Sequence, residues 1–217
     1  MDSKELIARR VAREIRPGSL VNLGIGLPSM VANFVPSSAG VFFQAENGVI
    51  GLGARPPEGM EDRHLTDAGG GFVTAVPGAA SIDSAMSFGL IRGGHLDMTV
   101  LGGLQVDEAG HLANWKVPGK MVPGMGGAMD LVTGAARVVV AMQHAARGES
   151  KIVPELILPL TALRRVDLVV TDLAVIEPMN EGLFLRERAP GVSVEAIVAA
   201  TAARLIIPDH VPEMILA

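Results

Sequence analysis

Apolar and polar residues follow two rhythms along this chain, one typical of helices and one typical of buried strands. Within residues 3–15, Ile7, Val11 and Ile15 recur at every fourth position, which predicts an amphipathic helix that Pro17-Gly18 ends. Helices are also expected at 28–34, 81–91, 128–132 and 194–205. Runs rich in apolar residues predict strands at 19–23, 41–45, 72–76, 96–101, 137–142, 166–171, 174–177 and 183–185.

Strands that alternate with helices predict the fold class. We expect an α/β fold whose open, mostly parallel (mixed) sheet carries helices on both faces. Hydrophobic residues make up 49% of the chain and aromatic residues only 3%, so the core must be largely aliphatic. No internal repeat or clear linker interrupts the pattern, so residues 1–217 are expected to form a single domain.

Composition excludes several classes of function. The chain has 18 basic and 23 acidic residues, and this net charge of −5 argues against a nucleic-acid binder. It has no Cys, so disulfides, thiolate metal sites and a cysteine nucleophile are ruled out, and the 5 His residues lack the spacing of a zinc site. No apolar run reaches the ~18 residues that cross a bilayer. The charged start Met1–Glu5 is unlike a secretory signal, so we expect a cytoplasmic protein with no membrane partner and no metal.

The segment Gln44-Ala45-Glu46-Asn47-Gly48 is the main candidate for chemistry. The apolar run Val41-Phe42-Phe43 leads to Glu46, and Asn-Gly, a strong turn signal, follows at once. This places the Glu46 carboxylate at a strand end, where ligands gather in α/β folds. The pattern alone leaves four roles open: a nucleophile, a base, a ribose ligand and a plain surface charge.

Two glycine-containing loops could surround this carboxylate. Gly24-Ile25-Gly26 lies between a strand and a helix, where backbone N–H groups can bind a phosphate. With Glu46 20 residues after Gly26, it imitates the dinucleotide fingerprint, so a nicotinamide-binding domain is one alternative, although Ser29 replaces the third glycine. The second loop ends in Gly126-Gly127, directly before the helix at 128–132, and could present N–H groups to an oxyanion.

Several longer motifs resemble one enzyme family. They are Ala45–Gly51 (AENGVIG), Val21–Pro28 (VNLGIGLP), Gly93–Asp97, Gln105–Asp107, Asn114–Lys116 and the loop through Gly127–Leu131. Together they make the chain similar to the small (B, or β) subunits of family I CoA-transferases, the 3-oxoacid type, over nearly all of its length. One position departs from the family motif, because Ala45 stands where the family has a serine before the glutamate.

The resemblance implies that Glu46 is the nucleophile of a ping-pong reaction through a glutamyl-CoA thioester. It implies that Asn22 and the backbone of Gly126-Gly127 stabilise the oxyanion. For the CoA itself the candidate residues are Gly24, Gly26, Lys116 and Lys120.

No cofactor is expected apart from the CoA thioester substrate. In this family each β chain pairs with an α chain (the A type), so we expect an α2β2 heterotetramer. The donor, such as succinyl-CoA or acetyl-CoA, and the acceptor, such as acetoacetate, 3-oxoadipate or a short-chain acid, stay open. An acyl-CoA hydrolase and a non-catalytic ligand-binding module on the same fold are further alternatives.

Overall fold

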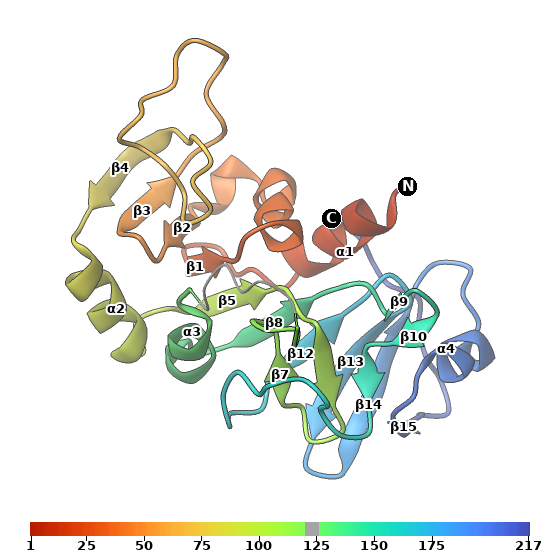
Figure 1. The fold of residues 1–217 in the computed structure, drawn as a ribbon. Helices are drawn as coiled ribbons and strands as arrows, with labels where there is room; N and C mark the ends of the chain where they lie inside the picture. Colours follow the sequence, from red (N-terminus) through yellow and green to blue (C-terminus); the bar gives the residue numbers. More distant parts are fainter. Residues whose placement is uncertain (120–125) are drawn as a thin grey trace.

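The central sheet has 10 strands in the order β15-β14-β13-β12-β8-β5-β1-β2-β3-β4, in a computed structural model that describes residues 1–119 and 126–217 (Figure 1). Its middle strands are parallel: β1 (Leu20–Leu23), β2 (Phe42–Ala45), β5 (Met98–Leu101), β8 (Val138–Ala141) and β12 (Leu168–Val170). Antiparallel strands extend both sides: β3 (Val49–Leu52) and β4 (Ala75–Ser81) on one, β13 (Ala174–Met179) and β14 (Gly182–Arg188) on the other. The strand β15 (Leu205–Ile206) pairs parallel to β14.

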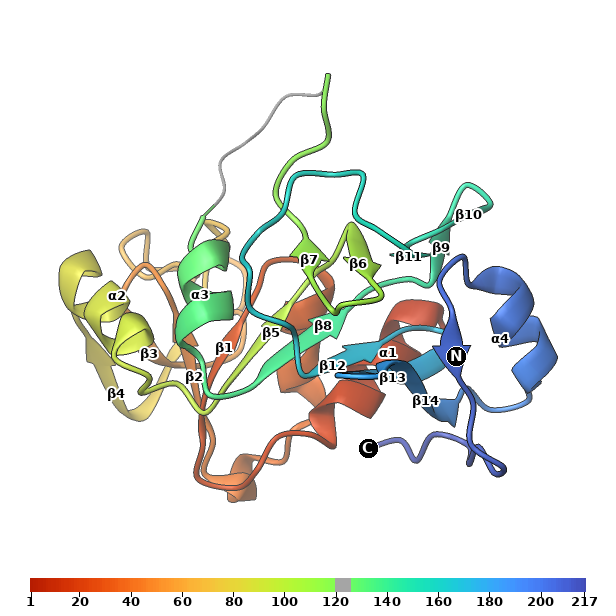
Figure 2. The ribbon, with the colours of Figure 1, turned by 90° about the horizontal axis from the view of Figure 1, so that it is seen from below.

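Helices cover both faces of this sheet, as the sequence predicts (Figure 2). All of Val138–Ala141 is buried, because alternate side chains enter two different apolar clusters. One cluster includes residues of α1 (Ser3–Ala12) and the 3₁₀ helix η1 (Leu27–Phe34). The other includes residues of α2 (Ser84–Arg92), α3 (Ala128–Gly134) and α4 (Val194–Ala200).

Small elements complete the described part of the chain. A short 3₁₀ turn, η2 (Ser37–Ala39), precedes β2. A small sheet joins β6 (Gln105–Asp107) to β7 (Leu112–Ala113) and β11 (Ile152–Val153), and β9 (Ala145–Ala146) pairs with β10 (Glu149–Ser150). Within these described residues no helix combines the length and the apolar character needed to cross a bilayer.

Some predicted boundaries were wrong. The helix expected at 194–205 ends at Ala200, and the chain then turns to add Leu205–Ile206 to the sheet edge beside β14. The strand expected at 72–76 begins at Ala75 and continues to Ser81, because it pairs with β3, which the sequence pattern did not reveal. The following helix therefore starts later, where the Asp83 side chain accepts a hydrogen bond from Met86 N at 2.8 Å.

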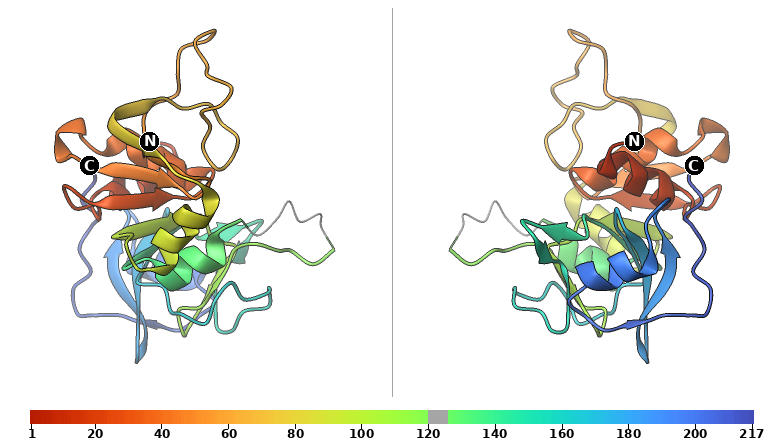
Figure 3. Two further views of the ribbon diagram at one scale, coloured as in Figure 1. Left: turned by 90° about the vertical axis from the view of Figure 1, so that its left-hand side faces the viewer. Right: turned by 90° about the vertical axis from the view of Figure 1, so that its right-hand side faces the viewer.

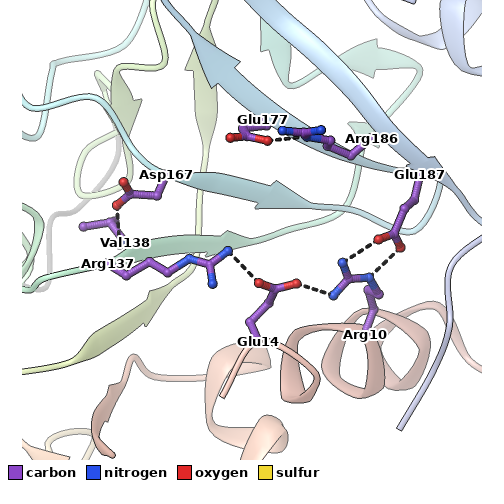
Figure 4. A network of polar contacts seen from close by, with 8 residues as sticks. All are labelled: Arg10, Glu14, Arg137, Val138, Asp167, Glu177, Arg186 and Glu187. Carbon is purple, nitrogen blue, oxygen red and sulfur yellow. Dashed lines mark hydrogen bonds and ion pairs between the residues drawn. The ribbon is translucent and has the colours of Figure 1, made fainter. Parts of the chain in front are cut away.

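An ion-pair network joins α1 to Arg137, directly before β8, and to Glu187 on β14 (Figure 4). Arg137 lies 2.6 Å from Glu14, Glu14 lies 2.6 Å from Arg10, and Arg10 lies 2.6 Å from Glu187 on β14. Burial lowers the pKa of Arg10, but hydrogen bonds to Glu187 and Glu14 and their charges raise it more, so the net shift is upward. The network therefore fixes α1 on the sheet.

Candidate active site

Glu46 lies in a tight turn where the parallel strand β2 ends and β3 begins (Figure 1). The N–H of Gly48 closes the turn by donating to Ala45 O at 3.0 Å. Gly48 has a φ of +119°, and a Cβ atom added there would lie 2.0 Å from the carbonyl oxygen of Ile82. Only glycine fits this position, which explains in physical terms why the turn contains Asn-Gly.

A second contact fixes the same turn from the side of the long segment between β3 and β4. The Asn47 side chain donates from Nδ2 to the carbonyl oxygen of Thr66 at 2.8 Å. This segment, residues 53–74, extends away from the sheet in both views of Figure 3. Close to that contact, Asp67 Oδ1 accepts hydrogen bonds from Gly69 N and Gly71 N at 2.8 Å each. The turn that carries Glu46 is therefore held from outside the sheet as well as from within.

Asn22, predicted from the sequence as an oxyanion donor, contacts the Glu46 carboxylate. Its Nδ2 lies 3.3 Å from Glu46 Oε2, and its side chain is fully buried on β1, beside β2. A distance of 3.3 Å is long for a hydrogen bond, but catalytic hydrogen bonds are often long before the substrate binds. One carboxylate oxygen of Glu46 thus faces an amide donor.

The glycine pair Gly126-Gly127 also lies next to Glu46. A Cβ atom added at Gly126 would lie 3.9 Å from Glu46 Oε1, and one at Gly127 would lie 3.3 Å from Glu46 Cγ and 3.3 Å from the ring of Phe88. The pair is far from Glu46 in sequence but close to it in space, because α3 precedes the parallel strand β8. The start of such a helix lies at the carboxyl-terminal edge of the sheet, where β2 also ends.

Sequence reasoning missed three buried residues that are linked to Glu46 through Asn22. Gln44, Ser87 and Thr99 are fully buried, and hydrogen bonds link them into one chain through Asn22. The available signal was a polar residue inside an otherwise apolar strand, at Gln44 in Phe42–Ala45 and at Thr99 in Met98–Leu101. What the sequence could not give was the strand register that brings these residues side by side.

The loop Gly24-Ile25-Gly26 has a different geometry from the phosphate loop that its glycines suggest. The N–H of Gly24 donates to Val100 O at 2.8 Å, so it is not available to a ligand, and an added Cβ would lie 3.1 Å from the same oxygen. Gly26 is exposed with a φ of +85°, and its carbonyl oxygen accepts from Ser29 N at 3.2 Å. Gly24 is therefore required for close packing on β5, whereas Gly26 remains accessible.

Ala45, where the family motif has a serine, lines a small pocket of about 120 Å³ together with Gly24, Gly26 and residues 67–69. Gln44, the neighbour on the same strand, instead bonds to Ser87 on α2. Because side chains alternate along a strand, a hydroxyl at position 45 would face this pocket and not the hydrogen-bonded chain that contains Gln44.

Of the two lysines predicted to bind CoA, only Lys116 lies among the described residues. The ammonium group of Lys116 lies 5.7 Å from the centre of the Trp115 ring, a cation–π distance. The predicted Lys120 lies outside the described residues. A groove of about 980 Å³ runs between η1 and the segment after β3, and Glu46 is not one of the residues that line it.

Comparison with known proteins decides the family to which this site belongs. The family model described as coenzyme A transferase matches residues 4–200. The chain belongs to the coenzyme A transferase family. It is 53% identical over 215 residues to the beta subunit of the acetate CoA-transferase of Haemophilus influenzae, covering 99% of this chain and 96% of that one. It is 49% identical over 201 residues to the B-type chain of the succinyl-CoA:3-ketoacid coenzyme A transferase of Helicobacter pylori, covering 92% and 97%.

Solved structures agree with the fold of this family. An acyl-CoA transferase of Escherichia coli O157:H7 superposes with a TM-score of 0.80 at 24% identity, covering 99% of this chain. The chain spans only 43% of that longer protein. The predictions of a CoA-transferase β chain and of its α/β fold are thus confirmed, and none of the alternatives weighed from the sequence is supported.

Proposed function

We propose that this CoA-transferase family member is the catalytic subunit that moves CoA from an acyl-CoA to a carboxylic acid through a thioester on Glu46. The observation that carries the proposal is the different surroundings of the two Glu46 oxygens. Oε2 faces the Asn22 amide at 3.3 Å, whereas Oε1 lies on the side of Gly126, where an added Cβ would be 3.9 Å away. A glycine there leaves room for a substrate beside Oε1.

The proposed reaction begins when Oε1 attacks the thioester carbonyl of the acyl-CoA. A C–O bond forms, the C–S bond breaks, and CoA leaves as a thiolate, so Glu46 becomes a mixed anhydride. The thiolate then attacks Cδ of Glu46, the bond from Cδ to the bridging oxygen breaks, and the donor acid leaves as a carboxylate. The acceptor acid reverses both steps, which gives covalent, ping-pong catalysis.

Each step forms a tetrahedral oxyanion that preorganised donors must stabilise. Asn22 and the backbone N–H groups of Gly126 and Gly127 are the proposed donors, and removing one such donor typically lowers kcat about 10²–10³-fold. No general base is needed, because both nucleophiles, the carboxylate and the thiolate, are already ionised. The proposed reaction uses no cofactor beyond the CoA thioester that is its substrate.

Substrates and assembly are proposed from the relatives. Their names specify acetate for one and succinyl-CoA with a 3-ketoacid for another, so short-chain acids and 3-oxoacids are the proposed acceptors, and succinyl-CoA or acetyl-CoA the proposed donor. Both relatives are named as one type of subunit (beta or B), which supports a partner of the complementary α (A) type and, as our finer proposal, an α2β2 heterotetramer. A cytoplasmic location agrees with a chain that has no Cys.

The decisive experiment is to incubate the enzyme, assembled with its partner subunit, with acyl-CoA in the absence of acceptor. We expect a peptide that contains Glu46 to gain the mass of CoA, and the Glu46→Gln variant to lose both the adduct and acyl exchange. Glu181→Gln is a matched control, because Glu181 also lies in a hairpin turn but at the opposite edge of the sheet. Acyl exchange by the Glu46→Gln variant would refute the mechanism, and acyl-CoA loss that needs no acceptor would indicate a hydrolase.

A further inference from the structure

A row of buried polar side chains crosses three parallel strands below the turn that carries Glu46. The strand register places Asn22 beside Gln44 on one side and beside Thr99 on the other, so all three face the same side of the sheet. Helix α2 covers this face and adds Ser87, and none of the four has any exposed surface. Apolar side chains would fill the same space with no need for hydrogen bonds, whereas buried polar groups are costly unless they form them.

The hydrogen bonds in this row run in one direction. Thr99 donates to Asn22 Oδ1 at 3.1 Å, Asn22 Nδ2 donates to Gln44 Oε1 at 2.9 Å, and Gln44 Nε2 donates to Ser87 Oγ at 2.9 Å. The hydroxyl groups at the two ends could each donate or accept, but Asn22 Nδ2 also donates to the backbone carbonyl oxygen of Gln44 at 3.2 Å, which favours this direction. Reversal would turn Asn22 Oδ1 toward the Glu46 carboxylate, which only the amide nitrogen can approach favourably.

We propose that Gln44, anchored by Ser87, is a positioning residue that holds the Asn22 N–H on Glu46 Oε2. The proposal rests on the glutamyl-CoA mechanism above. It assigns Oε1 as the oxygen that attacks and bridges, and Oε2 as the oxygen that stays on Cδ. When the CoA thiolate adds to Cδ, the negative charge passes to Oε2 until the Cδ–Oε1 bond breaks and the donor carboxylate leaves.

The role of Gln44 is therefore greatest when the charge on Oε2 is greatest. In the resting carboxylate the charge is shared between two oxygens, whereas in the tetrahedral intermediate it is concentrated on Oε2. A donor fixed beforehand stabilises this intermediate more than the ground state, which raises kcat and leaves substrate binding unchanged. This separates a positioning role from a simple packing role.

The test uses Gln44→Met, which keeps the approximate volume and removes both amide hydrogen bonds, in the enzyme assembled with its partner subunit. We expect kcat to fall about 10- to 100-fold and the KM for acyl-CoA to change less than about threefold. The rate at which the Glu46 peptide gains the mass of CoA should fall by the same factor as kcat. Ser87→Ala, which deletes one hydroxyl group, should lower kcat about three- to tenfold and covers the case in which Gln44→Met does not assemble.

Gln105→Met is the matched control, because Gln105 is also buried but its side-chain oxygen accepts hydrogen bonds from Ile157 N and Leu158 N instead of from Asn22. A loss of kcat in the Gln44 variant no larger than in this control would overturn the inference. So would an unchanged rate of adduct formation in both the Gln44 and Ser87 variants. An absence of the adduct from the unmodified enzyme would instead refute the proposed function, and this inference with it.

Discussion

Acid should destabilise this protein through one buried imidazole, that of His144, which follows β8 and has no exposed surface. Its Nδ1 and Nε2 each lie 2.9 Å from a threonine hydroxyl, that of Thr171 and that of Thr201. Thr201 donates its own proton to Ile197 O at 2.6 Å, whereas Thr171 Oγ1 lies farther from its other acceptor, Ala174 O at 3.1 Å, than from Nδ1. A neutral imidazole therefore fits best with Nε2 donating to Thr201 and Nδ1 accepting from Thr171. Burial lowers the pKa of His144 to about 4, although the charge of Asp172 opposes the shift.

The sign and size of the effect follow from proton linkage. Between the ordinary pKa of 6.5 and the folded-state pKa of about 4, the unfolded chain binds a proton that the folded chain excludes. The contribution of His144 is therefore fully present above pH 6.5 and is lost as the pH falls toward 4. The loss should approach ~1.4 kcal/mol per pH unit and reach about 3 kcal/mol in total.

Urea unfolding at several pH values between 7.5 and 4.5 measures this directly. The difference in free energy of unfolding between the natural protein and His144→Gln, which has no titrating ring, should shrink as the pH falls below 6.5. All other titrating groups cancel in this difference. A difference that stays constant from pH 7.5 to 4.5 would show that the folded protein accommodates a charged His144.

Two further predictions concern stability and the site. Gly48→Ala should lower the free energy of unfolding by about 3 kcal/mol or more, because the added Cβ would lie 2.0 Å from Ile82 O. Thermal unfolding would measure this loss. A melting temperature within about 2 °C of the original corresponds to about 1 kcal/mol or less and would contradict the prediction. Arg10→Leu should cost about 3 kcal/mol in urea unfolding, because it leaves Glu14 and Glu187 without their shared partner, and an unchanged midpoint would mean that water replaces Arg10.

The sequence by itself determined the fold class and the main candidate for the nucleophile. Apolar runs of strand length between helical segments fix an α/β fold, because each periodicity buries a face in only one kind of element. The Asn-Gly turn after 41–45 placed Glu46 at a strand end, which the structure confirms. The ends of elements were less certain, as at 194–205, because the pairing of Leu205–Ile206 with β14 outweighs local helix preference there.

Only the tertiary structure decided which residues surround Glu46. Strand register, which no local pattern encodes, sets Asn22 between Gln44 and Thr99. The parallel connection through α3 brings Gly126-Gly127 to the same edge of the sheet. The tertiary structure likewise showed that the Gly24 N–H is already bonded to β5, so its glycine serves packing. A chain specifies its elements by local periodicity, but a site is formed by contacts between residues far apart in sequence, and these exist only once the sheet has assembled.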